Sequence, residues 1–144
     1  MKKDIRIKIT GSQNEAGNTT EPEVTEITTT GVLFEKNGNI YIKYKEYMDE
    51  INDPVDNLLK FDDDRLELTK KGGVNSVMSF NRDRNCAVHY MTPYGPVDMN
   101  IFTEEYNMEH TDRGYNIDIR YSIDYAYEYI VSCGLNVSID YINN

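Results

Sequence analysis

The sequence has no long apolar run, no tryptophan and only two cysteines, Cys86 and Cys133. No stretch approaches the ~18 apolar residues of a membrane-spanning helix. Residues 4–9 alternate charged and apolar side chains, where a secretory signal would need an apolar region of about 7–15 residues. These absences predict a cytoplasmic protein, in which both cysteines are reduced thiols.

Positive charge is also scarce. The chain has 15 lysines and arginines against 25 aspartates and glutamates, which gives a formal net charge of −10 and a pI near 4.6. A protein this acidic is repelled by the phosphate backbone of nucleic acids and by anionic lipid surfaces. The charge therefore predicts no nucleic-acid partner and no membrane partner.

Catalytic and metal-binding motifs are missing as well. The chain has no Gly-x-Ser-x-Gly nucleophile turn. Cys86 and His89 have a ligand-like spacing, but residues three apart on a strand point to opposite faces of the sheet, and His110 is predicted to lie in a polar loop. The acidic stretch at 49–64 lacks the alternating ligands, the glycine and the final glutamate of a calcium loop. The sequence thus predicts no catalytic residue, no metal site and no cofactor.

What the sequence does contain is alternation of apolar and polar residues. The clearest case is 115–125, where tyrosine and isoleucine occupy every second position. A period of two predicts a half-buried β-strand, because successive side chains on a strand point to opposite faces. About nine such strands can be recognised, and no long helix. The segment 104–114 breaks the pattern and is predicted to be polar and mobile.

Glycines mark the expected turns and irregularities. Asn37-Gly38 is typical of a two-residue β-hairpin turn. Gly31, inside a Thr-rich strand pattern, predicts a bulge or a sharp bend. The first strand, which starts at Ile5, is predicted to end at Gly11-Ser12.

The stretch 90–99 is predicted to be a strand, a tight turn and the start of the next strand. Pro93 has no amide hydrogen to give to a ladder, and Gly95 can adopt a positive φ at little steric cost. The turn is expected to pair Tyr90 and Thr92 with Val97 and Met99. Register of this kind decides which face of a sheet is buried.

These elements together predict the fold. Short connections between successive strands favour up-and-down antiparallel pairing. A long open sheet would expose its edges, so we expect the sheet to close. The predicted fold is all-β: one domain over residues 1–144, consisting of a single antiparallel β-barrel of about 8–10 strands.

Several motifs are spread over roughly residues 5–141. They are Gly31, Gly73, Met78-x-Phe80, Tyr90-x-Thr92-Pro93-Tyr94-Gly95, Met99-x-Ile101-x-Thr103, and Gly114 with Tyr121 in the closing strand. Together these motifs resemble the YwiB-like β-barrel family. The resemblance implies a small cytoplasmic barrel, calycin- or lipocalin-like, of unknown function, and it supplies no active-site residues. The acidic segment 48–64 departs from the family pattern and leaves the strand count there open.

Tyrosine and arginine supply the candidate ligand-binding residues, which are Tyr90, Tyr121 and Arg82. Both tyrosines are expected on the inner face, and Arg82 lies in a turn from which a guanidinium can bind an anionic group in two-pronged fashion. The interior of a barrel of about eight strands is just wide enough for side chains or for one small ligand. Bulky inward residues favour a filled core and a structural role for the tyrosines. The alternative is a narrow pocket at one mouth.

Two main hypotheses for function follow. One is a binding protein that accepts a small apolar or aromatic molecule at a barrel mouth, which rests on analogy of fold. The alternative is a non-catalytic structural or interaction protein with a filled barrel, forming a homodimer through an exposed strand or sheet face. An enzyme is the least favoured interpretation.

Overall fold

A computed structural model of the chain describes residues 2–15, 23–47, 54–73, 75–92, 95–125 and 129–142, and almost all of them lie in strands. No helix in these ranges is long and apolar enough to cross a membrane. The strands are β1 (Lys2–Glu15), β2 (Glu23–Lys36), β3 (Asn39–Glu46), β4 (Val55–Phe61), β5 (Arg65–Gly72), β6 (Ser76–Asn81), β7 (Asn85–Thr92), β8 (Gly95–Thr111), β9 (Gly114–Tyr125) and β10 (Tyr129–Tyr141).

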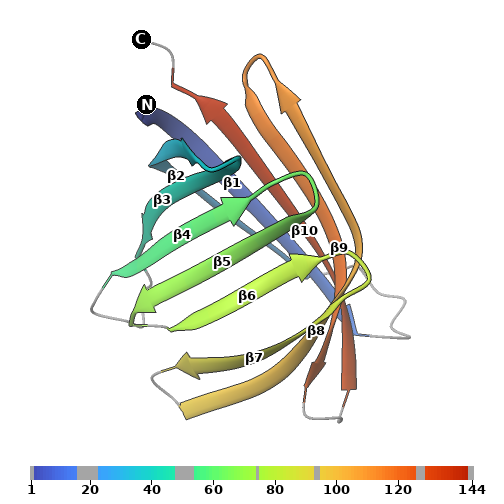
Figure 1. Cartoon of the computed structure of the whole chain (residues 1–144). Coiled ribbons are helices and arrows are strands. Elements are labelled where there is room, and N and C mark those ends of the chain that lie inside the picture. The colour runs from blue at the N-terminus through green and yellow to red at the C-terminus, as the bar shows by residue number, and fades with distance from the viewer. Residues whose placement is uncertain are drawn as a thin grey trace.

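The strands form one antiparallel sheet of ten strands that curls into a barrel (Figure 1). Its order is β6-β5-β4-β3-β2-β1-β10-β9-β8-β7, so β1 pairs with β10 and the edges are β6 and β7. The edges are joined at the corner formed by residues 82–84. There Asp83 donates its backbone N–H to the Thr103 carbonyl of β8 at 2.8 Å. The predicted antiparallel barrel of about 8–10 strands is therefore confirmed.

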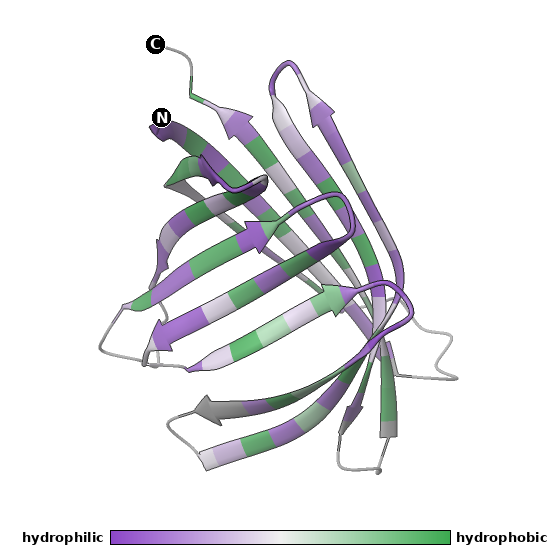
Figure 2. Cartoon of the chain, in the orientation of Figure 1, coloured by the Kyte–Doolittle hydropathy of each residue, from purple (hydrophilic) through white to green (hydrophobic). Residues whose placement is uncertain are grey.

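Apolar and polar residues alternate along the strands (Figure 2), and the apolar residues form the core inside the barrel. On β9, Ile117 and Ile119 are buried while Asp118 and Arg120 are exposed, as the period of two predicts. The largest fully buried side chains all point into the barrel from such positions. They are Phe61, Phe80, Ile5, Ile7, Ile42, Leu59, Leu66, Ile101, Ile117, Ile119, Ile139 and Val55.

The predicted hairpin at Asn37-Gly38 is confirmed. Asn37 has φ 52° and Gly38 has φ 80°, the pair of positive values that a type I′ turn needs. Of the two alternatives predicted at Gly31, a bulge or a sharp bend, the bulge is wrong, because β1 pairs with β2 through this residue without a register shift. A Cβ on Gly31 would lie 2.5 Å from the Lys43 carbonyl oxygen. The glycine therefore allows the backbone of β3 to approach closely.

The turn between β7 and β8 has the predicted position. Tyr90 pairs with Val97 as expected, but Thr92 pairs with Gly95 and not with Met99. Gly95 has a φ of 118°, which bears out its predicted left-handed conformation. Residues 93 and 94 lie outside the described residues.

The prediction for residues 104–114 is wrong, because β8 runs through nearly all of this segment and pairs with β9. A bulge between Thr103 and Glu105 inserts one extra residue into β8. The inward positions therefore change from odd to even numbers, so that Tyr106 is buried although Glu105 is exposed. His110, predicted to lie in a loop, lies in this strand.

Several strand ends also differ from the prediction. β1 continues past Gly11-Ser12 to Glu15, and β10 begins several residues before the alternating segment that starts at Leu135. Backbone pairing supplies the reason: residues of β1 near its end pair with both β2 and β10, so polar residues are held in a strand. The acidic residues 48–53 lie outside the described residues, and β4 begins at Val55.

Candidate functional site

The interior of the barrel contains side chains that meet from opposite walls. Phe61 on β4 packs edge-on against Tyr115 on β9, with ring centroids 5.3 Å apart and planes at 77°. Phe80 on β6 packs similarly against Tyr121, at 4.9 Å and 68°. Edge-to-face pairs of this kind are favourable because the positive ring edge meets the negative ring face. Each pair joins the β4–β6 wall to β9, so aromatic rings occupy the interior at two levels.

Tyr121, a predicted ligand-binding residue, is half-buried on β9. Besides packing on Phe80, it forms a hydrogen bond with the thiol of Cys133 on β10. Burial raises the pKa of the Cys133 thiol, and the hydrogen bond from Tyr121 opposes that rise only in part. A thiol held in its protonated form is a weak nucleophile. Tyr121 therefore packs on the core through Phe80 and Cys133.

Arg82, the second predicted residue, lines a hollow of about 470 Å³ at one end of the barrel. Its Nη2 donates to the Tyr106 carbonyl at 3.4 Å. Carboxylate, guanidinium and amide groups dominate the lining, which suits a polar or charged solute better than an apolar one. The lining residues are Asp62, Asp63, Asp64, Arg65, Asn81, Arg82 and Tyr106.

Tyr106 is one of the residues of this hollow that sequence reasoning missed, because the bulge in β8 hides its inward position. Its hydroxyl lies 3.0 Å from the carbonyls of both Asp62 and Arg65, so it ties the β4–β5 turn to β8. Burial, followed by the nearby charges of Asp62, Asp63 and Asp64, raises the pKa of Tyr106 well above its ordinary value. The hydroxyl therefore remains a neutral donor at physiological pH.

Tyr121 is not among the described residues that line the hollow at Arg82. Tyr90, the third predicted residue, pairs through its backbone with Val97, and its side chain lies outside the described residues. The described contacts thus do not unite the three candidates in one pocket.

A row of polar side chains crosses the inner face of β3–β6. Asn57, on β4, pairs with Tyr44 on one side and with Lys70 on the other, and Lys70 pairs with Ser76. Lys70 Nζ lies 2.7 Å from Glu46 Oε1 and 3.0 Å from Asn57 Oδ1, so a nearly buried ion pair is hydrogen-bonded on both sides. The sequence signal for this row is a polar residue at an inward position, and alternation alone does not single it out.

Two groups of this row have a distinct environment. Ser76 Oγ is buried and has no hydrogen-bond partner among the described residues. Burial first, and the Glu46 charge second, raise the pKa of Tyr44 well above its ordinary value. The charges of Lys70 and Glu46 cancel, and most polar groups of the row have hydrogen-bond partners. Buried charges require this kind of pairing.

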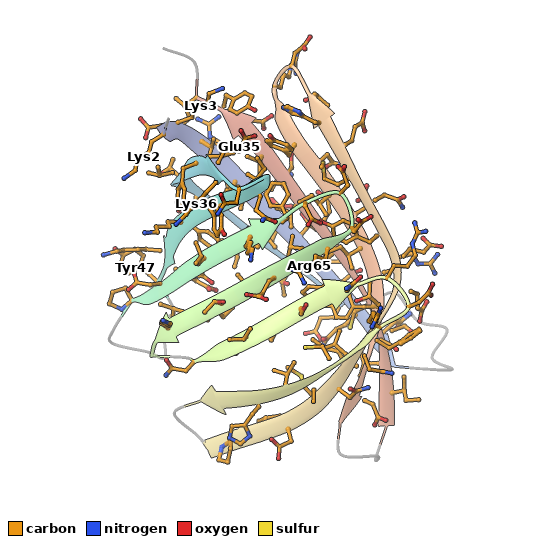
Figure 3. All side chains as sticks on the ribbon, viewed as in Figure 1. Lys2, Lys3, Glu35, Lys36, Tyr47 and Arg65 are labelled. Carbon is orange, nitrogen blue, oxygen red and sulfur yellow. The ribbon has the colours of Figure 1, made fainter. Side chains whose placement is uncertain are left out.

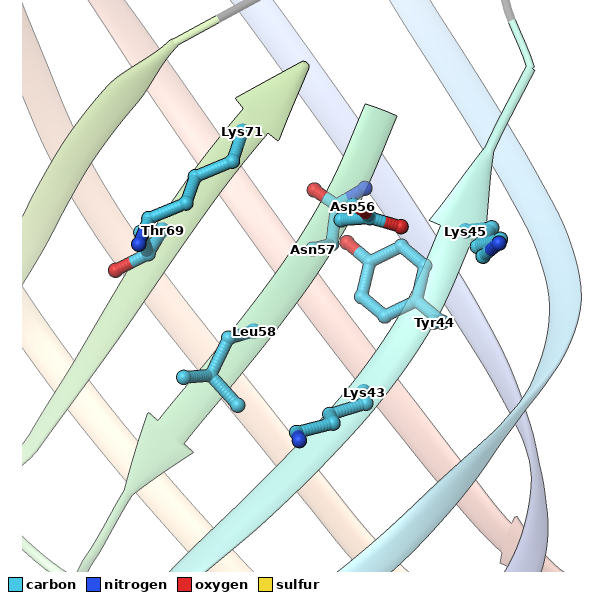
Figure 4. Close-up of a pocket in the computed structure, with 8 residues that line it drawn as sticks. All are labelled: Lys43, Tyr44, Lys45, Asp56, Asn57, Leu58, Thr69 and Lys71. Carbon is cyan, nitrogen blue, oxygen red and sulfur yellow. The ribbon is translucent and has the colours of Figure 1, made fainter. Parts of the chain in front are cut away.

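The outer face of the same strands carries a groove of about 520 Å³ (Figure 4). The register between the strands creates this groove. Five outward residues form a row across β2–β6, namely Val32, Lys43, Leu58, Thr69 and Val77. The adjacent row is Lys45, Asp56 and Lys71. The lining comprises the outward residues Lys43, Lys45, Asp56, Leu58, Thr69 and Lys71, together with Tyr44 and Asn57, whose side chains belong to the inner row.

The histidines and the second cysteine occupy ordinary positions in the sheet. His89 Nδ1 contacts Asp98 Oδ1 of the neighbouring strand, and both side chains are exposed. His110 stacks on Tyr115 at 4.2 Å between ring centroids. Cys86 is half-buried on β7 and forms no disulfide. Within the described ranges, no three His, Cys, Asp or Glu side chains are grouped so that they could hold a metal ion.

Comparison with known proteins agrees with this geometry. A family model described as a domain of unknown function, DUF1934, matches residues 7–137. Among solved structures, the chain is similar to the crystal structure of the ywiB protein from Bacillus subtilis, with a TM-score of 0.84 and 18% identity over 99% of this chain and 94% of that chain. No curated protein matches. The predicted resemblance to YwiB-like barrels is confirmed, and at this identity the structural likeness shows the fold alone.

Proposed function

We propose that this chain, which belongs to the DUF1934 family of domains of unknown function, is a non-catalytic binding protein that acts through the outside of a filled barrel. The observation that carries the proposal is the packing of Phe61 on Tyr115 and of Phe80 on Tyr121 across the interior. A barrel that holds a small molecule needs that space free. Here the chain's own aromatic rings occupy it.

The absence of catalysis is part of the proposal. Cys133 is buried among apolar side chains with a raised pKa, which disfavours the thiolate that nucleophilic catalysis needs. His89 is exposed and contacts an exposed carboxylate. Neither arrangement provides the enclosed acid–base pair that enzymes use. We also place the protein in the cytoplasm, where free Cys86 and Cys133 stay reduced.

Native mass spectrometry of the protein purified from its own cells tests the proposal, with the denatured mass as reference. We expect the mass of the polypeptide alone, as a monomer or as the predicted homodimer. A reproducible extra mass that is released on denaturation would show that the barrel carries a small molecule, and would overturn the filled-barrel proposal.

A second candidate function is binding of a small molecule at a barrel mouth, favoured by the hollow that Arg82 lines. Its charged walls indicate a polar ligand in place of the apolar one predicted from the sequence. A set of small molecules that carry both an anionic and a cationic group, such as amino acids, should then raise the melting temperature by mass action, because the lining offers both guanidinium and carboxylate groups. Arg82→Ala should abolish that rise, whereas Arg84→Ala, at an exposed position in the same turn and outside the described lining, should preserve it.

A further inference from the structure

We infer that the groove on the outer face of β3–β5 binds an acidic peptide segment that carries one apolar side chain. This inference rests on the proposed function and adds the surface and the chemistry of the partner. The groove lies outside the barrel, because its lining side chains Lys43, Leu58 and Thr69 alternate with residues that point into the core. Figure 4 shows these side chains on adjacent strands.

The floor of the groove offers an apolar contact. Leu58 stands at the centre of the outward row, directly between Lys43 and Thr69 on the neighbouring strands. Leu58 is only half-buried although it lies mid-strand. Val32 and Val77 extend the row at either end, and Val77 is 51% exposed. A partner side chain such as leucine can cover Leu58 and gain the usual benefit of removing apolar surface from water.

The walls of the groove are positively charged. Of the described lining residues, Lys43, Lys45 and Lys71 are cationic and Asp56 is the one carboxylate. None of these three lysines forms an ion pair with a described acidic side chain. Lysines without a described ion-pair partner, in a protein of net charge −10, form a local site for carboxylates.

An adjacent aromatic pair orients Lys43, one of the three lysines that line the groove. Phe34 and Tyr41 stack with ring centroids 5.1 Å apart and planes 4° from parallel. Lys43 Nζ lies 5.7 Å from the centroid of Phe34, and Lys60 Nζ lies 5.9 Å from that of Tyr41. Cation–π contacts at this range restrict a flexible lysine. The ammonium group of Lys43 is therefore held beside the groove, which lowers the entropic cost of binding a carboxylate there.

The size of the charged patch selects a short peptide over a nucleic acid. At physiological salt, charges further away than about 8 Å are largely screened. A short acidic segment therefore interacts with the lysines of the groove. A nucleic-acid strand long enough to extend beyond it also meets the carboxylates that give the molecule its overall negative charge, and is repelled.

Selection from a random peptide library displayed on phage, against the intact protein, tests the inference. We expect the selected peptides to share acidic residues around one apolar residue. A chosen peptide, synthesised with a fluorophore, should bind Lys43→Glu/Lys71→Glu protein about tenfold more weakly, since the repulsion at two sites adds up to roughly that factor. Leu58→Ser should weaken binding as well.

The matched control is Lys2→Glu/Lys36→Glu, which changes the net charge by the same amount at two exposed lysines outside the described lining (Figure 3). It should bind the peptide like the unaltered protein, and the urea midpoint of every variant shows that it is folded. Equal weakening by both double variants would mean a general charge effect and overturn the inference.

Other outcomes separate this inference from the proposed function. Selected peptides that lack acidic residues, or that bind regardless of the groove substitutions, would refute the groove as the site while the barrel remains a filled interaction protein. Binding of a fluorescent single-stranded oligothymidylate that the same lysine substitutions abolish would also overturn the peptide inference. A small molecule found by native mass spectrometry would overturn the proposed function itself.

Discussion

Gly95 and Gly114 are two of the four described glycines at which the backbone adopts a conformation that ordinary side chains avoid. Gly95 has φ 118° and Gly114 has φ 148°. The two differ in their surroundings. A Cβ on Gly95 would meet no atom of the described residues within 4 Å, whereas a Cβ on Gly114 would overlap the Ile139 carbonyl oxygen. A side chain at Gly95 would therefore suffer backbone strain alone, whereas a side chain at Gly114 would suffer backbone strain and a clash with β10.

Substitutions at these glycines should therefore differ in cost. Gly95→Val should lower the free energy of unfolding by roughly 1–3 kcal/mol, because a β-branched residue is strained at positive φ. Gly114→Ala should cost more, about 3–6 kcal/mol, because β10 must also move. Urea unfolding measures both. An unchanged midpoint for Gly95→Val would refute the conformation assigned to that turn, and Gly11→Ala, whose added Cβ only approaches Thr25 Oγ1 to 3.3 Å, serves as the control.

At the scale of single strands, β9 shows how far alternation determines structure. Ile119 is 1% exposed and points into the core. Its neighbour Arg120 is exposed and lies 3.8 Å from Glu105, with both side chains more than half exposed. Such a surface pair contributes little to stability. The inward residues of β9 therefore contribute far more to the free energy of unfolding than the outward ones.

Truncation of the two neighbours tests that difference. Ile119→Ala should cost about 2–5 kcal/mol, since it removes buried methylene groups and leaves a cavity. Arg120→Ala should change the free energy of unfolding by no more than about 0.5 kcal/mol. Chemical denaturation of both variants gives the comparison. A larger loss for Arg120→Ala than for Ile119→Ala would mean that the faces of β9 are inverted.

The same comparison shows what the sequence can predict. Regular alternation predicted β9, and the Asn37-Gly38 pair predicted its hairpin. Both predictions succeeded because these signals are local in the sequence. The bulge after Thr103 is also local, but it changes the phase of alternation, so β8 could not be followed past it. Its consequence, the buried Tyr106, therefore escaped prediction.

The candidate site depends on contacts between strands, and for that reason the sequence indicates little of it. Val32, Lys43, Leu58, Thr69 and Val77 form one outward row only because four registers align. A shift of one residue in any of these pairings would turn the later residues inward. Arg82 could be predicted as a residue at a barrel end, but its neighbours Asp62 to Asp64 come from a turn nearly twenty residues away in sequence.

At the scale of the whole molecule, buried tyrosines link stability to alkaline pH. Burial first, then the interactions of Tyr141 and Glu35, raise the pKa of Tyr115 from 10.0 to about 12. Tyr44 and Tyr106 are shifted in the same direction, chiefly by burial. Below pH 10 the folded and the unfolded protein both keep the hydroxyl protons of these tyrosines. Above it the unfolded chain releases them while the folded protein retains them, so stability declines with rising pH.

A series of urea unfolding curves at alkaline pH measures this effect. The midpoint should be constant up to about pH 10 and should fall steadily between pH 10 and 12, the window set by Tyr115. Tyr44→Phe should make the decline shallower, because one shifted group is removed. A midpoint that stays constant or increases across this window would contradict the burial of the tyrosine hydroxyls.

The pairing of β1 with β10 also has a consequence for synthesis on the ribosome. Strands β2–β6 can be added to β1 in the order in which they are made, and β7–β9 can pair with one another. These two groups become one sheet only when β10 pairs with both β1 and β9. Because β10 is made after the other nine strands of this sheet, its pairing joins the two groups, and until then one edge of β1 has no partner and can be bound by a chaperone.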